Sequence, residues 1–130
     1  MTHSKETQVR KVMYKIEHKI PDMNNKAISE ITGEIYQADF ELLAESIAIM
    51  RAQYLKKVVD IAREDQSKLS ASSFNEAREC KLAFQEAIES FNQLKRALHR
   101  GHFTLADANE LSNELNNEED DKNLWDDSEN

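Results

Sequence analysis

Apolar side chains recur at intervals of three and four residues along most of this 130-residue chain, which is the spacing of one face of an α-helix. Residues that interrupt helices are scarce, since the sequence contains one proline, Pro21, and two glycines, Gly33 and Gly101. Long helices are therefore the predicted structure. The pattern places them at residues 7–19, 23–66, 74–100 and 104–116.

The first of these helices carries a single narrow apolar stripe. Its members are Val9, Val12, Met13, Ile16 and Ile20. Pro21 predicts the end of the helix, because the residue before a proline avoids the α-helical region of backbone space. We expect this helix to pack across the open face of the helices that follow.

The second predicted helix carries two apolar stripes side by side. One follows a heptad and consists of Ile28, Ile31, Ile35, Ala38, Leu42, Ile49, Ala52 and Val59. The other consists of Tyr36, Phe40, Leu43, Ile47, Met50, Tyr54, Val58 and Ile61. Together they are wider than the seam of a two-stranded coiled coil, so this helix should contact at least two neighbours. Gly33 is its weakest point, and a break near residues 50–53 stays open.

Capping signals mark the remaining helix boundaries. A serine-rich loop ends at Ser73, which with Glu76 predicts a capping box at the start of the third helix. Gly101 predicts the C-terminal end of that helix. Thr104 and Asp107 repeat the capping pattern at the start of a short fourth helix.

These elements predict an all-α fold, an antiparallel three- or four-helix bundle with one long central helix. The bundle is expected to occupy residues 1–117. Residues 118–130 are expected to form a disordered acidic tail, because so polar a segment cannot bury enough apolar surface to stay ordered.

The net charge of −8 is concentrated at the C-terminus. Residues 109–130 contain nine acidic residues and one basic residue, Lys122, so they carry the whole −8. Residues 1–108 contain sixteen acidic and sixteen basic residues. The low isoelectric point therefore does not exclude an anion-binding surface on the helical part.

The composition favours a reducing compartment. Cys80 is the single cysteine, which excludes an intramolecular disulfide and a cysteine-based zinc site. Its place on the apolar stripe of the third helix is typical of a small core residue. The first twenty residues lack the apolar core of a secretory signal, and no apolar run approaches the roughly 20 residues of a membrane span. We therefore expect a cytoplasmic protein without membrane association.

The densest group of basic residues lies at the end of the third helix and in the turn after it. This basic cluster consists of Lys95, Arg96, His99, Arg100 and His102. Cations at a helix C-terminus complement the helix macrodipole, and this explanation is favoured because no aromatic platform for base stacking accompanies the cluster. The alternative is a surface that binds phosphate or nucleic acid.

Arg96 and His102 lie in the segment RALHRGH, which resembles the arginine–histidine motif of HEPN ribonucleases. Those enzymes are small helical bundles in which two subunits build one active site. The resemblance implies a dimeric ribonuclease with Arg96 and His102 as its catalytic pair. Ala97 and Gly101 depart from the pattern of that family, and a motif without its structural context is a hypothesis.

Other catalytic and cofactor signatures are absent from the sequence. A di-metal carboxylate bundle needs Glu-x-x-His pairs that face inward, and the sequence contains no such pair. The four histidines include no pair at i, i+4 spacing, and no glycine-rich phosphate loop is present. The sequence predicts neither a metal site nor a cofactor.

The acidic tail contains the single tryptophan of the chain. Leu124 and Trp125 are flanked by acids, among them Asp126 and Asp127. One aromatic anchor in an acidic frame is suited to dock on a basic groove of a protein partner. The same segment is suited to fold back on the basic cluster and compete with an anionic ligand.

The function expected from the sequence is that of a small non-enzymatic adaptor that binds a protein partner. A nucleic-acid-associated protein that uses the basic cluster is the alternative, and the ribonuclease is the second alternative. Homo-oligomerisation is also expected, because an elongated helical chain of this size buries little surface by itself.

Overall fold

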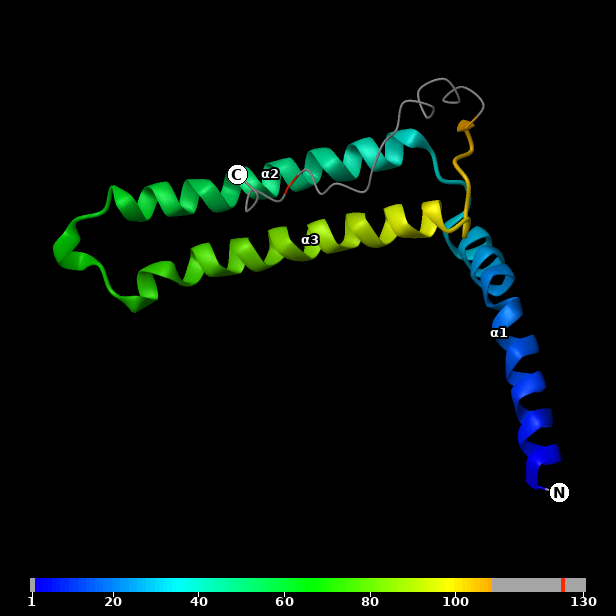
Figure 1. Cartoon of the computed structure of the whole chain (residues 1–130). Helices are drawn as coiled ribbons and strands as arrows, with labels where there is room; N and C mark the ends of the chain where they lie inside the picture. Colours follow the sequence, from blue (N-terminus) through cyan, green and yellow to red (C-terminus); the bar gives the residue numbers. More distant parts are fainter. Residues whose placement is uncertain (1, 109–124, 126–130) are drawn as a thin grey trace.

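The computed structural model describes residues 2–108 and Trp125. This part of the chain is all-α, as predicted (Figure 1). Its three helices are α1 (Thr2–Thr32), α2 (Gln37–Ala62) and α3 (Asn75–His99), and two short 3₁₀ helices, Gln66–Lys68 and Ala71–Phe74, lie between α2 and α3. Among the described residues the single β-type pairing is an isolated parallel bridge between Ile35 and Leu105. None of the described helices combines the length and the hydropathy that crossing a membrane requires.

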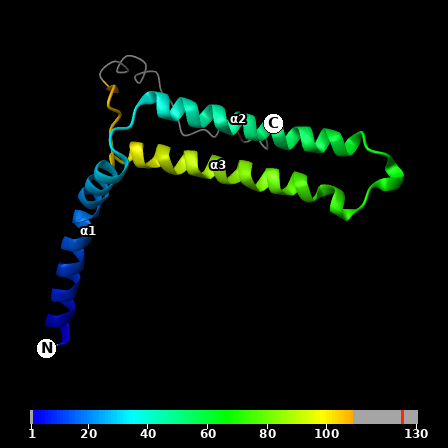
Figure 2. The same cartoon turned by 180° about the vertical axis from the view of Figure 1, so that it is seen from behind.

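The helices α2 and α3 run antiparallel and side by side as a long hairpin (Figure 1 and Figure 2). Between Phe40 and Ile61, one apolar stripe of α2 lies against α3, and all its members except Val58 are buried or half-buried. The stripe predicted on α3 is confirmed as its packing face, since every member from Ala77 to Leu98 is buried or half-buried. The core is thin: within the described residues, the buried hydrophobic side chains are Ile35, Ile47, Ala77 and Phe103.

The predicted end of the first helix at Pro21 is wrong, because α1 continues through this residue to Thr32. Proline inside a helix removes one backbone hydrogen bond, here to the carbonyl of Glu17. Pro21 and Glu17 are both exposed, so water can reach the carbonyl that loses its partner. The turns on either side keep their own hydrogen bonds and carry the helix past the proline.

The predicted long central helix is also wrong, because the chain breaks between α1 and α2 at residues 33–36. Gly33 has φ of +75°, the left-handed conformation that commonly ends a helix. The N-terminus of α2 is then capped twice. The Asp39 carboxylate accepts the Tyr36 N–H at 2.8 Å, and the Asp107 carboxylate accepts the Gln37 N–H at 3.2 Å. From residue 37 onward α2 is continuous, including residues 50–53.

The expected packing of the first helix across the hairpin is corrected by the structure. The helix α1 leaves the hairpin at a steep angle (Figure 1 and Figure 2). Of the three described helices, only α2 and α3 pack along each other. The α1 helix is attached at its C-terminal end, where the Asn25 side-chain amide donates to the Gly101 carbonyl at 3.2 Å and Ile28 is half-buried. The four residues after Thr32 do not reverse the chain, so a bundle of α1 with the hairpin does not form within this chain.

The capping box before α3 uses different residues from those predicted. The Ser70 N–H donates to the Ser73 hydroxyl at 3.1 Å, and the Ser73 N–H donates to the Ser70 carbonyl at 3.0 Å. Glu76 does not complete a box with Ser73, since its carboxylate pairs with Lys57 of α2 at 3.0 Å. The Glu76 side chain, which the local pattern assigned to the capping box, is therefore used in an ion pair across the hairpin.

The end of α3 follows the prediction closely. Gly101 has φ of +77°. The Gly101 N–H donates to the Leu98 carbonyl at 3.0 Å, and the His102 N–H donates to the Ala97 carbonyl at 2.9 Å. This pair of bonds is the Schellman motif, so the prediction that Gly101 closes the helix is confirmed.

The predicted start of a fourth helix at Thr104 is wrong. Leu105 forms the bridge with Ile35, and the Ala106 N–H donates to the Ile35 carbonyl at 2.8 Å. The Asp107 carboxylate caps α2, and Ala108 is the first helical residue of this segment. The rest of that helix, residues 109–116, lies outside the described residues, as does the predicted tail apart from Trp125.

Candidate interaction surface

The heptad stripe of α2 lies on the side that α3 does not cover. We call this surface the outer stripe and define it by Ala38, Leu42, Ile49, Ala52 and Val59, all of which are exposed. Leu42 is 61% exposed, Ile49 53% and Val59 41%. Isolated exposed hydrophobic residues are normal in folded proteins, but a row of them along one helix face is typical of an interaction site.

The outer stripe follows from the width of the apolar face of α2. A helix that is apolar over so wide an arc needs two neighbours, and in the described chain α2 packs along only one helix, α3. The sequence predicts at least two neighbours for this helix, and the described chain provides one. The outer stripe of α2 therefore remains open to solvent.

An aromatic cluster closes the end of the hairpin near α1. Phe40 of α2 meets Phe91 of α3 edge-on, with ring centroids 5.7 Å apart and an interplanar angle of 89°. Phe40 also stacks on Phe103, with centroids 6.4 Å apart. Trp125 adds a fourth ring, edge-on to Phe91 at 4.5 Å and 80°. The two edge-on contacts place the positive edge of one ring against the negative face of another.

Trp125 is thus the one described residue of the predicted partner-binding segment. It is half-buried against α3. Leu124, Asp126 and Asp127, the other residues predicted to bind a partner, lie outside the described residues. The sequence predicts Trp125 as an anchor for a partner, and this stays a prediction. Its contact with Phe91 joins residues too distant in sequence for any local pattern to reveal.

The basic cluster occupies the last turns of α3 and the turn after it. Lys95 and His102 are half-buried, and Arg96, His99 and Arg100 are exposed. Arg96 faces Glu89 two turns earlier, with 3.8 Å between the guanidinium nitrogen and the carboxylate oxygen. Both interpretations of the cluster fit this placement, since cations near the carbonyl end of α3 complement its dipole and exposed guanidinium groups can contact phosphates.

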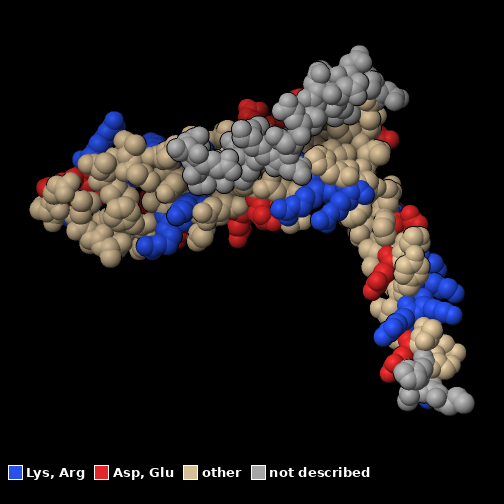
Figure 3. All heavy atoms as spheres, viewed as in Figure 1, with Lys and Arg blue, Asp and Glu red and all other residues tan. Residues whose placement is uncertain are grey.

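Figure 3 shows several groups of lysine and arginine on one face of the molecule, and two of these groups lie near or on α1. One lies over the part of the hairpin nearest to α1, and the other lies on the N-terminal half of α1. Acidic and uncharged residues separate them on this face. The basic residues of α1 therefore do not extend the basic cluster there.

Arg96 and His102 come from two different local structures. Arg96 belongs to the last turn of α3. His102 lies beyond Gly101, and its backbone N–H donates to the Ala97 carbonyl. The ribonuclease suggested by this pair stays a prediction. In the part of the chain that the structure describes, no group of three or more His, Cys, Asp or Glu residues is placed to hold a metal ion.

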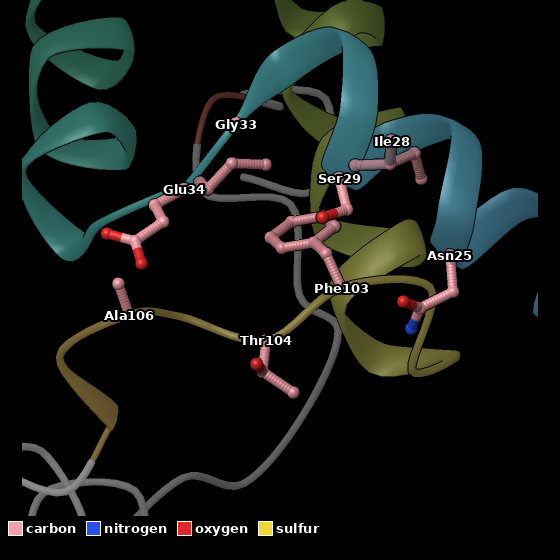
Figure 4. Close-up of a pocket in the computed structure, with 9 residues that line it drawn as sticks. Asn25, Ile28, Ser29, Gly33, Glu34, Phe103, Thr104 and Ala106 are labelled. Atoms are coloured by element: carbon pink, nitrogen blue, oxygen red, sulfur yellow. The ribbon is translucent and has the colours of Figure 1, made fainter.

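A pocket of about 310 Å³ lies at the attachment of α1, between Asn25, Ile28 and Ser29 on one side and the segment 103–106 on the other (Figure 4). In Figure 4 the ring of Phe103 reaches toward Ile28 and Ser29 of α1, and the Asn25 side chain reaches toward the turn after α3. The sequence did not predict this pocket, since it depends on the bridge between Ile35 and Leu105.

Glu34, which lines the pocket, is engaged by a neighbour. The Tyr36 hydroxyl donates to its carboxylate at 2.6 Å. This hydrogen bond, followed by the negative charge of Glu34, raises the pKa of Tyr36 above its ordinary value. The pocket therefore lies at the joint between α1 and the hairpin, and the carboxylate in its lining already accepts a hydrogen bond.

No protein-family model, curated protein or solved structure matches this chain. A functional assignment therefore rests on the geometry and chemistry of the chain itself.

Proposed function

We propose that this chain is a small non-enzymatic adaptor that binds a protein partner through the outer stripe of α2, with the segment around Trp125 as a docking or autoinhibitory element. The observation that carries the proposal is the exposure of Leu42 and Ile49 on a helix whose other apolar face is packed. Burial of such a row stabilises a complex by about 25 cal/mol per Å² of apolar surface, before the costs of association are subtracted.

The shape of the outer stripe favours an amphipathic helix as the partner element. A straight, narrow row at heptad spacing matches the apolar face of another helix. Glu45 and Lys56 stand at the two heptad positions between these apolar residues, both exposed and of opposite charge, so they would fix the direction of the partner helix. The three- or four-helix bundle expected from the sequence would then be completed by the partner.

The contact between Trp125 and Phe91 supports an autoinhibitory use of the tail. Phe91 is half-buried in the aromatic cluster, and Trp125 covers it from outside. Lys95 follows Phe91 by one helical turn, so it lies beside this contact, and the acids next to Trp125 in the sequence would be attracted to it. A partner that brings its own aromatic anchor to Phe91 would displace Trp125.

Affinity capture with matched variants tests the proposal. Full-length protein, Leu42→Glu and Trp125→Ala are compared in the native lysate, with and without nuclease. The control is Leu82→Glu, because Leu82 of α3 is also an exposed leucine (55%) but lies off the outer stripe. We expect one partner to be retained by the control, lost with Leu42→Glu and changed in yield with Trp125→Ala. Equal capture by Leu42→Glu and the control would overturn the proposal.

The alternative is a nucleic-acid-associated protein that uses the basic cluster. The observation that favours it is the gathering of lysine and arginine near the end of α3 (Figure 3). This alternative requires capture that is sensitive to nuclease, binding that falls steeply with salt, and loss of binding in Arg96→Ala combined with Arg100→Ala. We further propose a cytoplasmic location, which is supported by the single cysteine and its half-buried place on α3.

A further inference from the structure

The apolar stripe of α1 is open to solvent along its whole described length. Its heptad positions are Val9, Met13, Ile16, Ile20 and Met23, with exposed fractions between 43% and 61%. A helix held only at its C-terminal end has no tertiary packing to stabilise the remaining turns. We propose that α1 pairs with α1 of a second copy of this chain as an antiparallel two-stranded coiled coil.

The spacing of the stripe matches the seam of a two-stranded coiled coil. From Val9 to Ala27 the small and apolar residues follow one another at alternating intervals of four and three, without a charged interruption. The outer stripe of α2 lacks this regularity, since Glu45 and Lys56 interrupt it. Pro21 lies outside the seam positions, so the seam can continue past the proline.

The residues that flank the seam disfavour a parallel pair. In a parallel coiled coil, a residue at position g lies near the residue at position e five places later on the other helix. That arrangement brings Lys5 against Arg10, which repel each other, and Lys19 against Asn24. It provides Glu17 with no basic residue, so no attractive pair stabilises this orientation.

An antiparallel pair gives Arg10 and Glu17 partners of opposite charge. When Met13 faces Ile16 of the second copy, Arg10 faces Glu17 of the second copy, and the two-fold symmetry repeats this pair of opposite charges. Overlap from residue 5 to residue 24 gives a paired length of about 30 Å, with apolar seam positions from Val9 to Ile20 and Glu6 facing Met23 at each end. The overlap ends before Asn25, where the attachment of α1 to the hairpin begins. The two hairpins then lie at opposite ends of the coiled coil.

The mass of the full chain in solution, measured by light scattering after size exclusion, tests the pairing. We expect a mass twice 15.0 kDa. Ile16→Lys, at the centre of the seam, should yield a monomer, whereas Gln8→Lys, which adds the same charge on the outer side of α1, should remain a dimer. A monomeric wild-type chain, or a dimer that survives Ile16→Lys, overturns the proposal.

Folding of the variants is verified independently of the pairing. The melting of the hairpin should be the same in Ile16→Lys and Gln8→Lys, because α1 does not pack along α2 or α3. The adaptor function can fail while this dimer persists, since the Leu42→Glu variant of the outer stripe leaves the seam of α1 unchanged.

A charge exchange tests the orientation. Arg10→Glu or Glu17→Arg alone should raise the dissociation constant of the dimer, and the double exchange should restore it. In a parallel pair these residues do not meet, so the double variant would stay weak and the antiparallel arrangement would be rejected.

A distance measurement provides the second test of orientation. Spin labels at Ser4→Cys in a Cys80→Ala background should lie about 30 Å apart along the antiparallel coiled coil. A label separation of about 10 to 15 Å, the diameter of a helix pair, would reject it.

Discussion

Trp125 lies edge-on against Phe91, with the two ring centroids 4.5 Å apart and the ring planes at 80°. The contact joins the acidic C-terminal segment to the packing face of α3. Because Phe91 also meets Phe40 edge-on, the tail is connected through two rings to the seam of the hairpin. Displacement of Trp125 would therefore open Phe91, one helical turn before Lys95 of the basic cluster, to another aromatic ring.

Release of Trp125 can be followed by its own fluorescence, because it is the single tryptophan in the chain. Phe91→Leu should shift the emission toward that of solvated tryptophan, since an aromatic pair contributes about 0.5 to 1.5 kcal/mol beyond burial. High salt should cause the same shift in the unmodified protein by screening the acidic segment from Lys95. Leu82→Ala, on an exposed part of α3, serves as the control and should leave the emission unchanged. Unaltered emission in Phe91→Leu would contradict the contact.

The two stripes of α2 provide a matched pair of isoleucines. Ile47 has 0% of its surface exposed and Ile49 has 53%. Ile47→Ala should lower the free energy of unfolding by about 2 to 4 kcal/mol, because it removes packed methyl groups and leaves a cavity. Ile49→Ala should change it by less than about 0.5 kcal/mol. Urea denaturation of both variants checks the difference, and equal losses would contradict the assignment of the Ile47 stripe as the packed one.

Local signals account for the parts of the fold that were predicted correctly. The packing face of α3 follows from helical periodicity alone, and its end follows from the backbone freedom of Gly101. The parts that were missed depend on partners far away in the sequence. The Asp107 carboxylate caps the start of α2 although it lies seventy residues later in the sequence. Glu76 forms an ion pair with Lys57 and does not complete the predicted capping box with Ser73.

The candidate interaction surface was predicted only in outline. The two stripes of α2 were visible as periodicity, but which of them faces α3 depends on the geometry of the hairpin. The expected role of α1 as the second neighbour failed because the chain between Thr32 and Gln37 does not reverse direction. The contact between Trp125 and Phe91 joins residues far apart in the sequence, so no local pattern predicts it.

Replacement of Gly101, which caps the C-terminus of α3, should lower the stability of the fold through backbone strain rather than through packing. A Cβ at Gly101 would meet no atom within 4 Å, while φ is +77°. Gly101→Ala should therefore destabilise the hairpin by about 1 kcal/mol, through left-handed backbone strain alone. Gly101→Asn should cost less, because asparagine tolerates this conformation better than alanine does. Thermal unfolding of both variants measures the order, and a larger loss for asparagine would show that space rather than backbone conformation sets the cost.

The contribution of the turn between α2 and α3 to stability should depend on pH in the acidic range. The Asp65 carboxylate accepts the backbone N–H of Ser67 at 3.0 Å and its hydroxyl at 2.9 Å. These bonds, the backbone bond first, lower the pKa of Asp65 below its ordinary value of 3.8. Since the folded state holds the ionised form, the contribution of Asp65 to stability is complete above 3.8 and is lost as the pH falls through the lowered pKa.

Titration by nuclear magnetic resonance checks this directly, because the carboxyl carbon of Asp65 should change its chemical shift at a pH below the ordinary value of 3.8. Ser67→Ala removes the hydroxyl bond but keeps the backbone bond, so it should recover only the smaller part of the decrease in the pKa of Asp65. Full recovery in Ser67→Ala would mean that the hydroxyl, rather than the backbone N–H, stabilises the carboxylate.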